Sequence, residues 1–286
     1  MVFATRGHNA RARTPKERRR ARVYTAIAWR SFRRHATYRA ATAAGVFTNT
    51  VFGVILAYTF VALWEARPGV GGYNTLDALT YVWLGQAMLA VTEVFGGPFQ
   101  RELADRVRTG DIAIDLYRPV DMQAWFLASD LGRAAFSLAA RGLIPTAFGA
   151  LVFGFRWPEH PLTWLAFAVS IVLGTVVSYA IRFLVALSGF WLLESQGVEM
   201  LAGALGIFLS GMLLPLTVFP GLLGDVARLL PWAALLQVPA DIFLERHQGL
   251  DLLGALGFQT LWAVALLGIG RLVLLLATRK VVVQGG

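Results

Sequence analysis

The sequence contains no cysteine, which excludes disulfides, thiol catalysis and zinc sites built on thiolates. Lysine is nearly absent, occurring only as Lys16 and Lys280, and no segment matches the phosphate-binding loop G-x-x-x-x-G-K-[ST]. Any ATP hydrolysis must therefore come from a partner, which would bind the ATP and Mg²⁺. The four histidines lack metal-ligand spacing, so we predict no catalytic residue, no metal site and no cofactor in this chain.

Charged residues are also scarce. They make up 15% of the chain, against about a quarter in a typical soluble domain. Apolar residues make up 57% and come in long blocks, so lipid is the expected solvent for most of the surface. The net charge of +9 is concentrated before residue 40, ahead of the first apolar block. That placement indicates a topology signal or lipid contact, and we expect no nucleic acid to bind.

The apolar blocks predict membrane spans, because a transmembrane helix requires about 20 mostly apolar residues. Five blocks reach that length, and a sixth is shorter and interrupted by proline. The expected fold is an all-α polytopic membrane protein with six transmembrane helices in one domain, residues 23–286. The spans are predicted at about 43–63, 76–95, 134–155, 162–187, 198–219 and 252–277.

The distribution of basic residues predicts the orientation of these spans. With the N-terminus inside, the inner segments hold nineteen lysines and arginines and the outer segments hold four. Cytoplasmic loops carry such an excess in membrane proteins. Both termini are therefore expected in the cytoplasm.

The segment before the first span has two predicted parts. Residues 1–22 are expected to form a disordered basic cytoplasmic tail. Residues 23–38 place Tyr24, Ile27 and Phe32 on one half of a helix and arginines on the other. That pattern predicts a helix lying at the membrane interface.

The segment between the fifth and last spans is apolar but repeatedly broken by proline. Its apolar pieces of ten to fourteen residues are too short to cross a bilayer and indicate a re-entrant helical hairpin on the outer side. A seventh span is the alternative, and it would place Arg279 and Lys280 outside. The residues that mark the hairpin are Pro215, Pro220, Pro231, Trp232 and Pro239.

The inner loop after the second span predicts a short amphipathic helix. Phe99, Leu103 and Val107 form an apolar stripe, and Thr109-Gly110 ends the helix. Such a helix suits docking into a groove of a soluble partner, and the alternative is a helix that rests on its own spans or on lipid. The docking region would comprise Phe99, Arg101, Glu102, Leu103, Arg106, Val107, Arg108, Gly110 and Asp111.

Four ionisable residues fall inside predicted spans, where such residues are functional candidates. All lie in the inner half, so anchoring by side chains that reach the interface is favoured over a functional role. A pair between Glu93 and Arg141 is a further possibility. The four residues are Glu93, Arg141, Arg182 and Arg271.

From residue 23 onward the chain resembles the ABC-2-type permeases of bacterial ABC exporters. The features that carry the resemblance are the basic helix before the first span, the inner run 108–119 (RTGDIAIDLYRP), the late run 210–216 (SGMLLPL), and Phe219-Pro220 and Leu230-Pro231-Trp232. The resemblance implies a coupling helix in the first inner loop and an outer re-entrant hairpin. It also implies a second permease subunit, a cytoplasmic ABC ATPase dimer, and a multi-pass location in the bacterial inner membrane.

The expected function is therefore a permease subunit of an ABC exporter, without its own ATPase site, for an apolar or amphipathic substrate. The alternative is an ion-coupled secondary transporter, which would call for an acidic residue near mid-membrane on a broken helix. An integral membrane enzyme lacks a converging nucleophile and base or a metal set.

Overall fold

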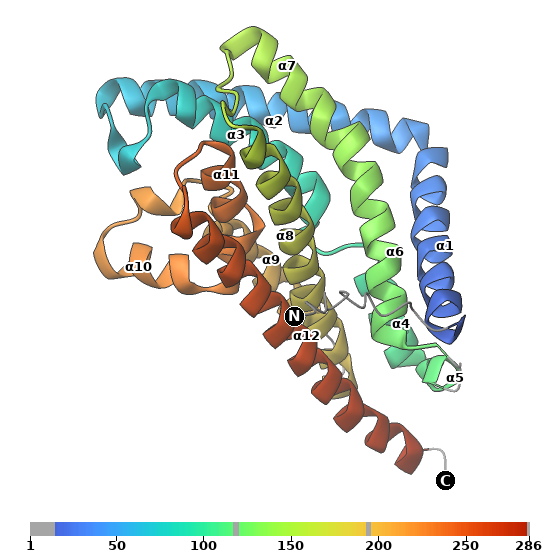
Figure 1. Ribbon diagram of the computed structural model, residues 1–286. Helices are drawn as coiled ribbons and strands as arrows, with labels where there is room; N and C mark the ends of the chain where they lie inside the picture. Colours follow the sequence, from blue (N-terminus) through green and yellow to red (C-terminus); the bar gives the residue numbers. More distant parts are fainter. Residues whose placement is uncertain (1–14, 117–119, 193–195, 285–286) are drawn as a thin grey trace, which may run out of the picture.

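The computed structural model describes residues 15–116, 120–192 and 196–284, and these residues form helices and no strands (Figure 1). The α-helices are α1 Pro15–Thr37, α2 Arg39–Ala66, α3 Thr75–Thr92, α4 Pro98–Thr109, α5 Ile112–Leu116, α6 Met122–Ser137, α7 Leu143–Phe153, α8 Pro161–Leu187, α9 Gln196–Ser210, α10 Gly221–Leu229, α11 Gln237–Phe243 and α12 Leu250–Gln284. Short 3₁₀ turns and one π-helical turn, Leu138–Gly142, connect some of them.

Among the described residues, four helices are long and apolar enough to cross a membrane: Arg39–Ala66, Met122–Phe153, Pro161–Phe190 and Leu250–Ala277. The chain is thus a multi-pass membrane protein.

The other two predicted spans correspond to α3 and α9. Fifteen of the eighteen residues of α3 are buried by neighbouring helices, including Asp77 and Gln86. Because α3 is enclosed by protein, it can carry polar side chains that would be costly against lipid. Helix α9 has only 15 residues.

The third span differs from its prediction at 134–155. One continuous helical segment runs from Met122 to Phe153, so the helix begins twelve residues earlier than predicted. The carboxylate of Asp121 caps its start by accepting a hydrogen bond from the Ala124 amide at 2.8 Å. Asp130 and Arg133, which the prediction placed in the inner loop, therefore lie inside this helix.

The N-terminal helix is longer than predicted. Residues 15–22, assigned to a disordered tail, form the start of α1, and residues 1–14 lie outside the described part of the chain. Helix α1 lies alongside α6 (Figure 1). The Phe32 and Phe136 rings meet edge to face at 5.6 Å, and Gly132 lets the two backbones approach at Ala28. The apolar face of α1 thus covers α6.

The proline-broken segment contains only short helices. Among its described residues none exceeds the nine residues of α10, so the structure gives no seventh spanning helix there. Pro215, Pro231 and Pro239 are buried, Trp232 is half-buried and Pro220 is exposed. Glu245 follows α11 and accepts hydrogen bonds from the Glu159 and His160 amides and the Thr163 hydroxyl at the start of α8.

The core has two main parts. One is built around α8, which packs along α12 and also contacts α4 and α6. The other surrounds Trp83 of α3, which is fully buried. Gly53 of α2 and Gly149 of α7 leave room for its indole, since an added Cβ would lie 2.4 Å and 2.0 Å from it. Large aromatic burial of this kind fixes how α2, α3 and α7 fit together.

Candidate functional site

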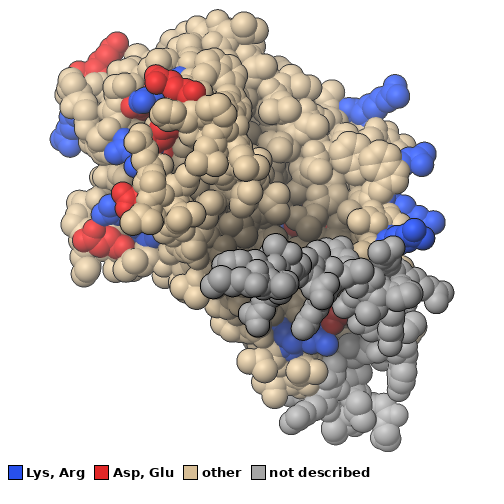
Figure 2. Space-filling model, in the orientation of Figure 1, with Lys and Arg blue, Asp and Glu red and all other residues tan. Residues whose placement is uncertain are grey.

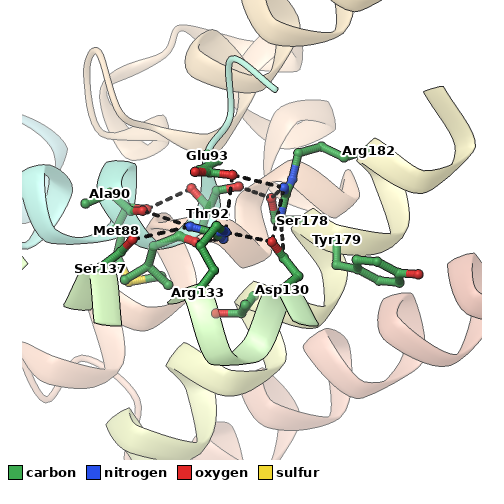
Figure 3. Close-up of polar contacts among 12 residues, drawn as sticks. Met88, Ala90, Thr92, Glu93, Asp130, Arg133, Ser137, Ser178, Tyr179 and Arg182 are labelled. Carbon is green, nitrogen blue, oxygen red and sulfur yellow. Dashed lines mark hydrogen bonds and ion pairs between the residues drawn. The ribbon is translucent and has the colours of Figure 1, made fainter. Parts of the chain in front are cut away.

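Four charged side chains meet inside the protein where α3, α6 and α8 converge, directly beside the start of α4 (Figure 3). Glu93 ends α3, Asp130 and Arg133 belong to α6, and Arg182 belongs to α8. The exposed fractions of Asp130, Arg133 and Arg182 are only 2%, 3% and 4%. We call these four residues the charge network.

The charge network contains two carboxylates and two guanidinium groups, so its formal charges cancel. Asp130 is bound on both oxygens, to Arg133 Nε at 2.7 Å and to Arg182 at 2.6 Å. Glu93 lies 3.2 Å from Arg133 Nε and 3.5 Å from Arg182. Because a buried charge without a partner is strongly unfavourable, each member depends on the others to remain inside the protein.

The remaining donors of the charge network fasten the C-terminal end of α3. Arg133 donates to the carbonyls of Ala90 at 3.3 Å and Val91 at 2.7 Å. Arg182 Nε donates to Ser178 Oγ at 3.3 Å, and that hydroxyl donates to the Thr92 carbonyl at 2.6 Å. The last carbonyls of a helix lack partners within it, so these bonds satisfy groups that would otherwise be buried without one.

The backbone between α3 and α4 is shaped to fit the charge network. Glu93 adopts a left-handed conformation with φ 47°, which is unfavourable for a residue with a side chain. Gly97 follows, and a Cβ at this position would lie 1.9 Å from Glu93 Oε2 and 2.9 Å from Arg182. Glycine therefore allows α4 to begin in contact with the network.

Helix α4 confirms the predicted amphipathic helix and its end at Gly110, which has φ 82°. The sequence left two interpretations of the apolar stripe open, docking into a partner and resting on the chain's own spans or on lipid, and the stripe lies against the chain's own helices. Phe99 and Leu103 are buried, and the Phe99 ring lies 5.1 Å from Tyr179 with the Arg182 guanidinium 4.8 Å above it. The stripe packs on its own spans, because α6 and α8 supply aromatic and charged partners for it.

The opposite face of α4 is open. Arg101, Glu102, Arg108, Gly110 and Asp111 are exposed, whereas Arg106 and Val107 are half-buried. Arg106 joins α4 to α5 through Asp115 at 2.7 Å and also binds Glu102 at 2.9 Å. Partial burial works against the charged form of Arg106, but the bonds to Asp115 and Glu102 outweigh it and raise its pKa above the usual value. Of the resembling run 108–119, residues 117–119 lie outside the described residues.

The other predicted intramembrane residues behave differently from one another. Glu93 does not pair with Arg141, because Arg133 and Arg182 occupy its carboxylate, while Arg141 packs beside Gly45 of α2. Arg182 is ion-paired inside the protein, so the anchoring interpretation is wrong for it. Arg271 pairs with Asp121 at a partly exposed position, as expected of a side chain near the interface.

A second buried polar cluster holds the proline-broken segment against α3. Gln237 of α11 accepts from the Leu216 amide at 2.7 Å and from the Tyr81 hydroxyl at 3.1 Å. It also donates to the Tyr73 hydroxyl and to Asp241, each at 2.8 Å, and Tyr73 donates to Asp241 at 2.5 Å. These bonds satisfy buried polar groups and orient α11.

A family model described as ABC-2 family transporter protein matches residues 49–285. The chain belongs to this ABC-2 transporter family. No curated protein and no solved structure matches the chain. The match begins within α2 and includes all of the charge network and α4, while α1 and the first turns of α2 precede it.

The sequence identified half of the charge network of this ABC-2 permease and missed the other half. Glu93 and Arg182 were noticed because they interrupt apolar runs. Asp130 and Arg133 were missed because the charges in 101–133 suggested one continuous loop. A usable signal was the spacing of Asp130 and Arg133, three residues apart on one helical face ahead of an apolar stretch.

Proposed function

We propose that this chain is the permease subunit of an ABC exporter and that a separate ATPase dimer docks on the exposed face of α4 and α5. The observation that carries the proposal is the two-sidedness of α4. Its charged face is open, whereas its apolar face is locked to α3, α6 and α8 through Phe99, Leu103 and the charge network. A push on the open face would move these helices together.

In this proposal the protein crosses the membrane six times. Two of the crossings are α3, which is enclosed by other helices, and α9, which is short. The positive-inside distribution supports a cytoplasmic position for both termini and for α4. The proline-broken segment would form the outer re-entrant hairpin in a bacterial inner membrane. A second permease subunit would complete a pathway for an apolar or amphipathic substrate, since the long apolar helices contain few charged residues.

The secondary-transporter alternative is not favoured by the site. Buried carboxylates do occur, as Asp130 and Glu93, but each is held by arginine. An ion-coupling carboxylate must gain and lose a cation or proton during each cycle. The charge network is instead arranged as a neutral structural junction.

Docking is tested by reversing charge on the open face of α4. Arg101→Glu combined with Arg108→Glu should leave the permease folded, because both side chains are exposed. Co-purification of a phosphate-loop ATPase from host membranes should fall sharply, because like charges facing each other cost several kcal/mol. Arg228→Glu on α10 is the matched control and should retain the ATPase. Full retention by the α4 variant would refute docking at this face.

A further inference from the structure

An open groove of about 660 Å³ lies at the bend between α1 and α2. Its walls come from the first half of α2, with Ala43, Val46 and Phe47, and from α6 and the π-helical turn, with Phe136 and Ala140. Arg39 is its only charged wall residue and stands at the first position of α2. Ligand sites are commonly apolar hollows of about 300–1,000 Å³ with a few polar groups that fix orientation.

The charge beside this groove is positive and uncompensated. Arg30, Arg33, Arg34 and Arg39 are exposed, and no carboxylate in the described part of the chain pairs with any of them. Figure 2 shows basic side chains gathered along the edge where α1 lies, with no acidic side chain next to them in this view. An anionic group would therefore complete this surface.

The groove thus offers an apolar channel with a guanidinium group at one end. That combination fits an amphiphile with an anionic head and a hydrocarbon chain. Arginine binds phosphate oxygens through paired N–H donors, and each buried methylene of a chain contributes about 0.8 kcal/mol. The positive-inside distribution places Arg39 at the cytoplasmic leaflet, where anionic phospholipids reside.

We propose that this groove binds one anionic phospholipid, with its phosphate on Arg39 and one acyl chain between α2 and α6. The bound lipid would fill the space between α2 and α6 beside the end of α1. Arg39, Ala43, Val46 and Phe47 precede the family match, which begins at residue 49, whereas Phe136 and Ala140 lie within it. The proposal is independent of any ATPase partner and goes beyond the proposed transport function.

The experiment measures lipid binding to the purified full-length protein by native mass spectrometry. The probes are phosphatidylglycerol and phosphatidylcholine with identical acyl chains. Wild-type protein should bind one phosphatidylglycerol more tightly than phosphatidylcholine. Arg39→Gln should weaken phosphatidylglycerol binding about fivefold, the equivalent of about 1 kcal/mol per basic residue, and leave phosphatidylcholine unchanged. Arg30→Gln, elsewhere on the basic face, is the matched control and should have little effect.

A second pair of variants tests the apolar channel. Ala43→Phe fills the groove and should weaken binding of both lipids, whereas Ala44→Phe, exposed on the same helix outside the groove, should not. Ala140→Phe fills the groove from the opposite wall and should reproduce the effect of Ala43→Phe. Agreement between two filling variants on different helices excludes misfolding of one of them as the cause.

Three results would overturn the proposal. Equal affinity of the wild-type protein for the two lipids would show that the groove does not select an anionic head group. Equal weakening by Arg39→Gln and Arg30→Gln would indicate diffuse attraction to the surface. Because the chain has no cysteine, Phe47→Cys can also report a second copy: a disulfide-linked dimer without saturable phosphatidylglycerol binding would assign the groove to a partner subunit.

Discussion

Removing Asp130 should destabilise the permease more than any other single substitution in the charge network. Its two oxygens bind Arg133 at 2.7 Å and Arg182 at 2.6 Å, and its exposed fraction is 2%. In Asp130→Leu, Glu93 alone would face two buried guanidinium groups. Breaking a buried pair on one side costs about 3–5 kcal/mol, because it leaves an uncompensated charge.

The assay is thermal unfolding of the purified protein in detergent, and unfolding is measured as the loss of the monodisperse peak. At roughly 2–4 °C per kcal/mol, Asp130→Leu should lower the unfolding temperature by roughly 6–20 °C. The double variant Asp130→Leu with Arg182→Met removes one charge of each sign. It leaves Glu93 and Arg133 as a neutral pair 3.2 Å apart, so it should be more stable than Asp130→Leu alone.

The double variant distinguishes an effect of unbalanced charge from a simple loss of packing. If the two substitutions acted independently, their effects would add. Recovery of stability in the double variant would show that charge balance holds the network together. An Asp130→Leu protein that unfolds within about 2 °C of wild type, or a double variant with fully additive loss, would refute the account.

Three further outcomes are expected. Gly97→Ala should lower stability by about 1–3 kcal/mol in thermal unfolding, because its Cβ would lie 1.9 Å from Glu93 Oε2, whereas Gly254→Ala, with open space around it, should not. Gly132→Leu should push α1 off α6 and speed tryptic cleavage in α1, since even a Cβ there would lie 1.9 Å from the Ala28 carbonyl; unchanged cleavage would contradict this packing. The hydrogen bond from the His160 amide holds the pKa of Glu245 below its usual value. The contribution of Glu245 to stability is therefore complete above the ordinary carboxyl pKa and is lost as the pH falls through the lowered pKa. Glu245→Gln should reduce this loss of stability at acid pH in unfolding scans, and an unchanged pH profile would contradict the expectation.

The sequence predicted best where one physical signal dominates. The long, mostly apolar runs 43–63, 162–187 and 252–277 fall within α2, α8 and α12. The period of Phe99, Leu103 and Val107 and the terminal Gly110 likewise marked α4 correctly. In each case the signal is local, because apolar length and helix periodicity need no knowledge of distant segments.

The predictions were wrong where tertiary partners change the meaning of a residue. Asp130 and Arg182 are 52 positions apart in sequence, so nothing local shows that their charges cancel. Because they are paired, Asp130 and Arg133 can lie inside a helix. A hydropathy count begins that helix only after them. Leu103 shows a related limit of local signals. Helix periodicity marks the apolar stripe but does not say whether the surface that covers it belongs to a partner or to the chain itself.

Docking of an ATPase on the open face of α4 can be detected by site-directed cross-linking. Asp105 is exposed on this face, and the chain has no native cysteine, so Asp105→Cys carries a single thiol. Treatment of inside-out host membrane vesicles with a thiol–amine cross-linker should join this permease to a phosphate-loop ATPase. Leu222→Cys, exposed on α10, should yield no such adduct. An ATPase adduct from Leu222→Cys, or none from Asp105→Cys while the ATPase still co-purifies, would contradict the account.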